Sequence, residues 1–63
     1  YHETIGDYVQ KLRVSHAAKL LMDPTNQLAE IAYSCGFADQ SHFTRVFKRR
    51  VGLTPGAFRD SLN

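Results

Sequence analysis

The sequence contains little of what several classes of protein need. Its 63 residues include one cysteine, two prolines and no tryptophan. A single cysteine excludes an internal disulfide, which favours a reducing compartment such as the cytoplasm over secretion. No apolar run approaches the roughly 20 residues of a membrane-spanning helix. No segment alternates apolar and polar residues as a half-buried strand does, so we expect a small helical domain.

The chain does contain enough apolar residues for one such domain. Its hydrophobic content is 43%, which is high for a disordered segment. A domain of this size buries only about 60% of its unfolded surface and has no room for an enclosed active-site cleft. Because the chain begins at Tyr1 rather than at a methionine, we expect it to be part of a longer protein.

The charge is unevenly distributed along the chain. The formal net charge is +2. Residues 1–32 carry three basic and four acidic side chains, whereas residues 33–63 carry five basic and two acidic ones. A basic half on a small domain favours a polyanionic partner such as a nucleic acid.

Three turn signals, at residues 23–27, 36–39 and 52–56, divide the chain into four expected helices. The helices are expected at about 5–22, 28–35, 40–51 and 55–62. The side chains best suited to cap them are Thr4, Asn26, Asp39 and Thr54. Gly36 and Gly52 follow the second and third helices, where a positive φ carries no steric penalty in glycine. The fold class expected is therefore all-α.

The first helix carries two apolar stripes on partly rotated faces. One stripe belongs to its N-terminal half and consists of Ile5, Tyr8, Val9 and Leu12. The other belongs to its C-terminal half and consists of Ala17, Leu20 and Leu21. This offset predicts that different neighbours cover the two ends of the helix.

The segment QSHFTRVFKRRV, residues 40–51, separates two kinds of side chain. At about 100° per residue, one side carries Phe43, Val46, Phe47, Arg50 and Val51. The opposite side carries Ser41, Thr44, Arg45, Lys48 and Arg49. The aromatic residues are thus expected to anchor the helix while most of the basic residues face away. Arg50 leans toward the anchored side, where it either reaches out to a phosphate or covers apolar surface.

Helices 28–35 and 40–51 with their short connection predict a helix-turn-helix. In that motif the N-terminal part of the second helix enters the major groove of DNA. Gln, Ser, Thr and Arg side chains are types that hydrogen-bond base edges. We therefore expect base contacts from Gln40, Ser41, Thr44 and Arg45. The expected phosphate contacts are His42, Lys48, Arg49 and Arg50.

A catalytic or metal site is not expected. Cys35 lies on an apolar helical stripe and behaves there as a small buried hydrophobe. The histidines at 2, 16 and 42 lack zinc-ligand spacing, and a nucleophilic cysteine needs a paired base and a pocket. We therefore expect no enzyme, no metal and no cofactor.

The stretch EIAYSCGFADQSHFTRVFKRRVGLTPGAFR, ending at Arg59, resembles the second helix-turn-helix of the AraC/XylS-type transcription regulators. The positions that carry the resemblance are Ile31-Ala32, Gly36-Phe37, Asp39, Ser41, Phe43, Arg45, Phe47-Lys48, Gly52, Thr54-Pro55 and Arg59. Upstream, YVQKLRVSHAAKLL resembles the linker helix of that family. Cys35 departs from the family's usual aliphatic residue, Gln27 from its Ser or Thr cap, and His2 from its glycine.

This resemblance implies a homeodomain-like fold with a linker helix at 4–22, a helix-turn-helix at 27–51 and a closing helix at 54–62. It implies sequence-specific binding to double-stranded DNA in a bacterial, cytoplasmic transcription regulator, with the recognition helix 40–51 in the major groove. Gln40, Ser41, Thr44 and Arg45 fall where family members present residues to bases. The implied partners are RNA polymerase and, within the same protein, a first helix-turn-helix and an effector domain.

Two other hypotheses fit the residues. The chain could be a helical interaction module whose basic face docks an acidic protein partner. It could also be a structural subdomain that only backs DNA phosphates while another unit reads the sequence.

Overall fold

The computed structural model describes residues 4–62, within which four helices are the regular elements. They are α1 (Ile5–Leu21), α2 (Leu28–Ser34), α3 (Gln40–Val51) and α4 (Pro55–Ser61). Each begins and ends within one residue of its expected position, and the predicted all-α fold class is confirmed. The sequence difference noted at His2 lies outside the described residues.

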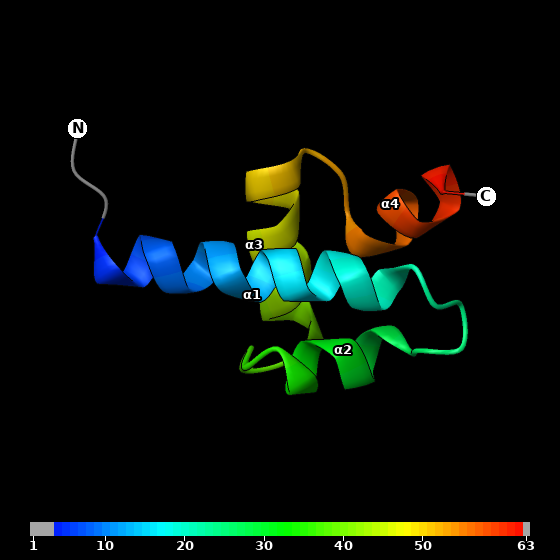
Figure 1. The fold of residues 1–63 in the computed structure, drawn as a ribbon, viewed down its shortest axis with the longest axis horizontal. Helices are drawn as coiled ribbons and strands as arrows, with labels where there is room; N and C mark the ends of the chain where they lie inside the picture. Colours follow the sequence, from blue (N-terminus) through cyan, green and yellow to red (C-terminus); the bar gives the residue numbers. More distant parts are fainter. Residues whose placement is uncertain (1–3, 63) are drawn as a thin grey trace.

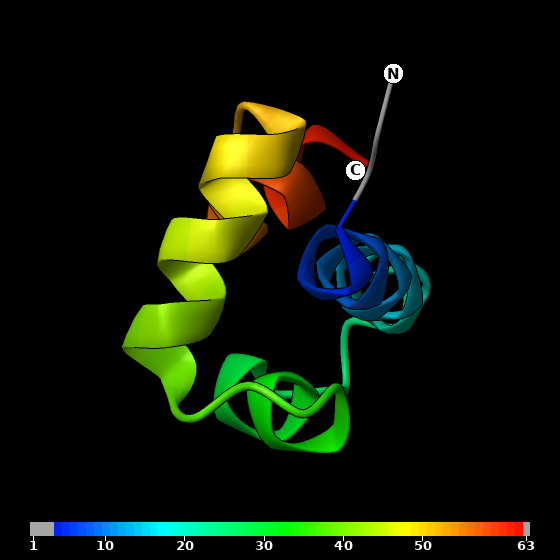
Figure 2. The same cartoon turned by 90° about the vertical axis from the view of Figure 1, so that its left-hand side faces the viewer.

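Helix α1 is the longest element, and the other three helices all pack against it (Figure 1). α2 runs alongside α1, α3 crosses it, and α4 lies near the end at which α1 leads into the α1–α2 turn. Figure 2 shows α1 almost end-on, with α3 on one side and α2 below. The faces of α2 and α3 turned away from α1 are therefore open to solvent.

The core lies where α1, α2 and α3 meet. Phe43 and Phe47 are fully buried there, with relative exposures of 0%. A chain of aromatic rings joins Phe37, Phe43, Phe47 and Phe58, with successive centroids 5.1, 5.6 and 5.4 Å apart. The prediction that Phe43, Val46 and Phe47 anchor the third helix is confirmed, whereas the inward placement of Val51 is wrong because its side chain is 38% exposed.

Side-chain caps fix the starts of three helices. The hydroxyl of Thr4 accepts from the backbone N–H of Asp7 at 3.0 Å. The carboxylate of Asp39 accepts from His42 N–H at 2.7 Å, and Thr54 accepts from Ala57 N–H at 3.2 Å. These satisfy backbone donors that a helix leaves without internal partners.

The cap expected for α2 is wrong. α2 begins after Gln27, whose side chain makes no capping hydrogen bond. Asn26 instead donates from Nδ2 to the carbonyl oxygen of Leu20 at 3.0 Å. Its amide therefore ties the α1–α2 turn back to the end of α1, where the last carbonyls need donors.

The turn between α2 and α3 depends on Gly36, whose φ is +86°. The N–H of Phe37 donates to Ala32 O at 3.0 Å, and the N–H of Gly36 donates to Tyr33 O at 3.2 Å. This pair of bonds is the Schellman motif, in which glycine takes the left-handed conformation without a Cβ clash. The turn sets the direction in which α3 leaves α2.

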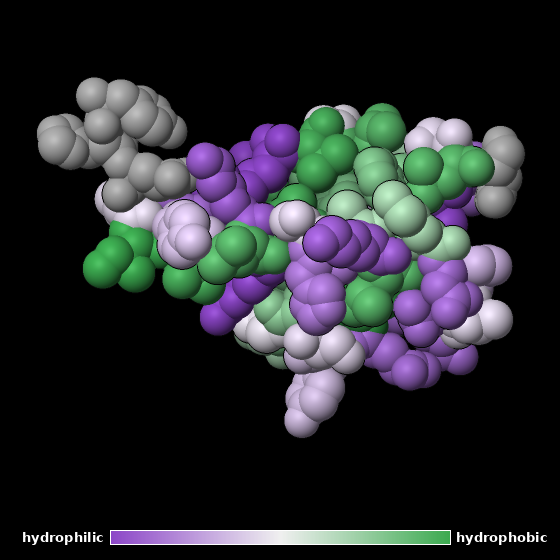
Figure 3. All heavy atoms as spheres, viewed as in Figure 1, coloured by the Kyte–Doolittle hydropathy of each residue, from purple (hydrophilic) through white to green (hydrophobic). Residues whose placement is uncertain are grey.

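The N-terminal half of α1 extends beyond the core. Ile5 is 83% exposed, and Tyr8 and Leu12 are also exposed. Figure 3 shows hydrophobic atoms open to solvent along this end of α1. Within residues 4–62, the core takes in the C-terminal stripe of α1. The prediction that a different neighbour covers the N-terminal stripe stays a prediction.

Candidate nucleic-acid interface

The outward face of α3 is a ridge of polar and basic side chains. Ser41, Arg45 and Lys48 follow one another at i, i+4 and i+7, and all three are exposed. They lie opposite Phe43 and Phe47, which are buried. Because the buried rings fix the rotation of α3 about its own axis, they also fix the direction in which this ridge points.

Two of the residues predicted to contact bases flank this ridge. Gln40 is the first residue of α3 and is exposed, and Thr44 lies one turn later with partial exposure. The hydroxyl of Thr44 donates to the backbone carbonyl of Gln40 at 2.9 Å. Its proton is therefore used within the helix, which leaves the oxygen as an acceptor and the methyl group as an apolar contact. The structure thus brings all four predicted base-contact residues, Gln40, Ser41, Thr44 and Arg45, to one end and one side of α3.

The residues predicted to contact phosphates do not share one environment. Lys48 and Arg49 are exposed in the last turn of α3. Arg50 turns to α1, where its guanidinium hydrogen-bonds Gln10 and Asp7. His42 turns toward the start of α3 and packs edge-on against Phe37, with ring centroids 5.5 Å apart.

The ring of His42 has a defined hydrogen-bonding role. Its Nδ1 accepts from the backbone N–H of Ala38 at 3.3 Å. A nitrogen that accepts from an amide carries no proton, so the tautomer assigned by this bond has its proton on Nε2. His42 therefore supports the α2–α3 turn through one nitrogen while the other is a donor.

The charge of α3 is entirely positive. Its four charged residues are Arg45, Lys48, Arg49 and Arg50. The last three lie in the final turn, where positive charge interacts favourably with the negative end of the helix dipole. Local helix stability and attraction for a polyanion therefore favour the same residues, so the charge alone does not distinguish the two roles.

The structure gives Cys35 a buried, apolar setting. The thiol lies at the junction of α1 and α2, with Sγ 3.7 Å from Nδ1 of His16. Burial raises the pKa of the Cys35 thiol, which disfavours the thiolate needed for nucleophilic attack or metal binding. Within residues 4–62, no group of three or more potential ligands lies close enough to hold a metal ion. His2, the remaining histidine of the sequence, is outside that range.

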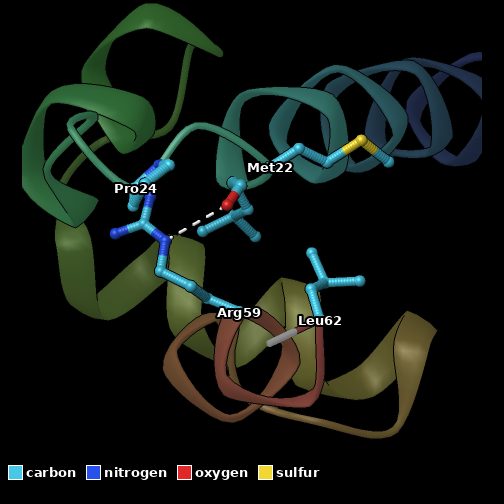
Figure 4. A pocket seen from close by; sticks show the side chains of 5 residues that line it. Met22, Pro24, Arg59 and Leu62 are labelled. Carbon is cyan, nitrogen blue, oxygen red and sulfur yellow. Dashed lines mark hydrogen bonds between the residues drawn. The ribbon is translucent and has the colours of Figure 1, made fainter.

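A cavity of about 300 Å³ lies away from the α3 ridge, between the end of α1 and α4 (Figure 4). Its walls are mainly apolar and include Met22, Pro24 and Leu62, with Arg59 at one side.

No helix of residues 4–62 is long and apolar enough to cross a membrane.

Arg59 has a structural role that the sequence analysis did not identify. Its guanidinium donates to the carbonyl oxygens of Leu21 at 3.2 Å, Asp23 at 3.3 Å and Asn26 at 2.6 Å. These carbonyls belong to the end of α1 and the turn that follows, so one side chain of α4 holds the α1–α2 connection. An arginine directly after the inward-facing Phe58 was the available signal, but its partners lie 33 to 38 residues away.

A helix-turn-helix with a solvent-facing basic ridge on its second helix is the arrangement of DNA-binding proteins. A family described as a helix-turn-helix domain, of the AraC type, matches residues 1–61. The chain belongs to this family of DNA-binding transcription regulators, which are not enzymes. The family resemblance stated from the sequence is confirmed.

Several transcription regulators are similar to this chain. The HTH-type transcriptional activator RhaR of Klebsiella pneumoniae subsp. pneumoniae is 41% identical over 56 residues, which are 89% of this chain and 20% of that protein. The probable transcription factor PqrA of Proteus vulgaris is 41% identical over 58 residues, 92% of this chain and 48% of that protein. The RhaR of Salmonella arizonae is 38% identical over 60 residues, 95% of this chain and 21% of that protein.

The chain therefore spans between about a fifth and a half of the length of these relatives. No solved structure gave a significant match to it.

Proposed function

We propose that the chain binds double-stranded DNA sequence-specifically, with α3 as the recognition helix in the major groove. The observation that carries this proposal is the outward ridge of Ser41, Arg45 and Lys48, held opposite the buried Phe43 and Phe47. A major groove about 12 Å wide admits one α-helix. The caps and the Gly36 turn hold α3 in one orientation, so its outward side chains meet the groove in a defined register.

The side chains differ in what they are suited to read. Arg45 is suited to a bidentate contact with guanine, and Gln40 to one with adenine. Because Thr44 donates its proton to Gln40 O, its oxygen is suited to accept from a base amino group and its methyl to contact thymine. Ser41, with a free hydroxyl at the N-terminal end of the ridge, is suited to either type of base contact.

Phosphate contacts are proposed for residues with an exposed positive charge or with an N–H donor that the turn does not use. Lys48 and Arg49 are exposed one to two turns beyond the base-reading end of α3. His42 has Nε2–H as a donor because Nδ1 is used by the turn. Contacts of this kind supply much of the affinity and make it depend on salt.

Further partners follow from the same proposal. The exposed stripe of Ile5, Tyr8 and Leu12 suits the attachment of a first helix-turn-helix of the same protein, for which α1 would be the linker. Large apolar side chains that lie together on one helix face are typical of a surface that another element covers. An effector domain, RNA polymerase and a cytoplasmic location in a bacterium are proposed on the role of the family alone.

The proposal is tested by selecting duplexes from a random-sequence pool with the full-length protein and measuring binding to the selected duplex at several KCl concentrations. Arg45→Ala should weaken this binding by about 1–3 kcal/mol and relax the preference at one base pair. Lys48→Ala should weaken binding to all duplexes and lower the salt-dependence slope by about one unit. Lys19→Ala is the control, because Lys19 is an exposed cation on α1 away from the ridge.

Each alternative hypothesis has its own outcome. If Arg45→Ala weakens binding equally on every duplex, this unit only backs phosphates and does not read bases. If the wild-type protein enriches no sequence and shows no salt-dependent binding, the basic face is a docking site for another kind of partner.

A further inference from the structure

Arg50 is the one residue of the basic segment 48–50 that hydrogen-bonds another helix of the described chain. Its Nη2 donates to Oε1 of Gln10 at 3.2 Å and pairs with Oδ1 of Asp7 at 3.3 Å. Its Nε lies 3.4 Å from the same oxygen of Gln10. Asp7 and Gln10 are one turn apart on α1, so the guanidinium spans two adjacent side chains of that helix.

The position of Arg50 on α3 accounts for this direction. It follows Val46 by four residues and Phe47 by three, so it lies on the buried side of the helix. The Arg50 side chain is 23% exposed, whereas Asp7 is 55% exposed. Gln10 and Val14 are also four residues apart, and Val14 is buried. The Arg50 contact therefore continues the α1–α3 core packing out to the C-terminal end of α3.

This contact holds the end of α3 that lies opposite the base-reading end. With a rise of about 1.5 Å per residue, Arg50 lies about 4.5 Å along the axis from the buried Phe47, and Ser41 lies about 9 Å away in the other direction. Tilting α3 about Phe47 thus moves Ser41 about twice as far as Arg50. Hydrogen bonds to bases weaken when the donor–acceptor distance changes by a few tenths of an ångström. A small displacement of α3 at Arg50 should therefore weaken the base contacts of the ridge.

We propose that Arg50 is a positioning residue: through Asp7 and Gln10 it fixes the angle at which α3 crosses α1, and thereby the fit of the recognition ridge in the groove. This inference rests on the proposed DNA-binding function and replaces the phosphate contact first expected of Arg50. It makes the N-terminal half of α1 part of the recognition apparatus. It also divides three consecutive basic residues between two tasks, because Lys48 and Arg49 face solvent.

A positioning role and a phosphate-binding role of Arg50 predict different effects of Asp7→Asn on DNA binding. If Arg50 positions α3, this change loosens the contact and lowers the ratio of affinities for the selected and a scrambled duplex. The expected loss is about two- to five-fold, the range that measured couplings of exposed ion pairs support. If Arg50 binds phosphate, the change releases the guanidinium, removes a negative charge and strengthens binding to both duplexes.

The experiment measures that ratio by fluorescence anisotropy of the full-length protein, using a duplex selected by the wild type and a scrambled duplex, at several KCl concentrations. Asp7→Asn and Arg50→Gln should each lower the ratio, and the double variant should lower it no further, because both remove the same contact. Arg50→Lys should also lower it, since an ammonium does not reproduce the planar fork that spans Asp7 and Gln10. A phosphate contact would survive that substitution.

Two matched controls complete the test. Arg49→Gln removes the same charge one residue earlier and should reduce the salt slope by about one unit, a reduction that Arg50→Gln should not show. Asp60→Asn removes an exposed carboxylate on α4 and should leave the ratio at its wild-type value.

The inference is overturned if the ratio stays at the wild-type value in Asp7→Asn and Arg50→Lys, or if Arg50→Gln lowers the salt slope as Arg49→Gln does. These results leave the DNA-binding proposal standing. A wild-type protein that does not distinguish the two duplexes overturns the DNA-binding proposal, and the positioning role of Arg50 with it.

Discussion

Replacing Arg59 with methionine removes the guanidinium that joins α4 to the end of α1 while keeping most of the aliphatic stem. Three carbonyl oxygens lose a charged donor in this variant: those of Leu21, Asp23 and Asn26. Two of the three hydrogen bonds are partly buried and the one to Asp23 is exposed. Water therefore replaces the lost donor fully at Asp23 and incompletely at the other two carbonyls.

The size of the effect follows from these surroundings. A hydrogen bond from a charged donor contributes about 1.5–3 kcal/mol, and bonds that share one donor group are not additive. Two partly buried bonds and one exposed bond give an expected loss of about 2–4 kcal/mol in the free energy of opening α4 from α1. In hydrogen exchange this corresponds to a roughly 30- to 700-fold loss of protection.

The assay is amide hydrogen exchange of the full-length protein, followed by mass spectrometry on peptides that cover residues 16–28 and 55–62. Arg59→Met should raise exchange in both peptides. Arg49→Met is the matched control, because Arg49 is exposed on α3 and exposed substitutions change stability by at most about 0.5 kcal/mol.

Equal protection in the Arg59→Met and Arg49→Met proteins would refute the reasoning, because it would mean that packing around Phe58 alone holds α4 in place. Loss of protection confined to residues 55–62 would show that Arg59 steadies α4 but not the α1–α2 turn.

Two further predictions concern the core. Phe47→Ala should destabilise the domain by about 3–5 kcal/mol. This loss is comparable to the whole stability of about 3–9 kcal/mol expected for a domain this small. Circular dichroism should then show no cooperative melting, whereas a near-native melting temperature would contradict the burial of this ring. Because burial raises the pKa of the Cys35 thiol, the folded state disfavours the thiolate, so stability should fall as pH rises from the ordinary thiol range toward that raised pKa. Cys35→Ala should remove this part of the pH dependence, and an unchanged slope of stability against pH between 7 and 10 would contradict it.

The helix boundaries were predictable because capping residues and terminal glycines mark most of them in the sequence. Thr4, Asp39 and Thr54 cap three helices through bonds to N–H groups three residues ahead, and such contacts are local enough to read from the sequence. Gly36 and Gly52 end two helices with positive φ. The cap expected of Asn26 was wrong for a physical reason. Asn26 lies on a turn whose shape the sequence does not specify, and its amide donates instead to the carbonyl of Leu20, six residues back at the end of α1.

The two faces of α3 were also predictable, since 3.6 residues per turn places Phe43 and Phe47 opposite Arg45. The hydrogen-bond partners of the two long side chains Arg50 and Arg59 were not predictable. Arg50 bonds residues 40 and 43 positions away, and Arg59 bonds residues 33 to 38 positions away. Such pairings depend on how the helices cross, and helix periodicity does not determine crossing.

The basic run from Lys48 to Arg50 shows why a charge cluster in a sequence does not make one binding site. Successive side chains on a helix point about 100° apart, so three in a row span about 200° and cannot all face the same partner. On a helix that is anchored along one side, at least one of the three must turn toward the anchor. Arg50 is that residue, and Asp7 with Gln10 supplies the partners that make its inward direction favourable.

The same geometry applies to any recognition helix packed on a linker helix. The cation that points at the linker is the one whose removal should change specificity without changing the number of phosphates neutralised. Salt dependence and base preference are therefore separable readouts for Arg49 and Arg50, although the two residues are adjacent and carry the same charge.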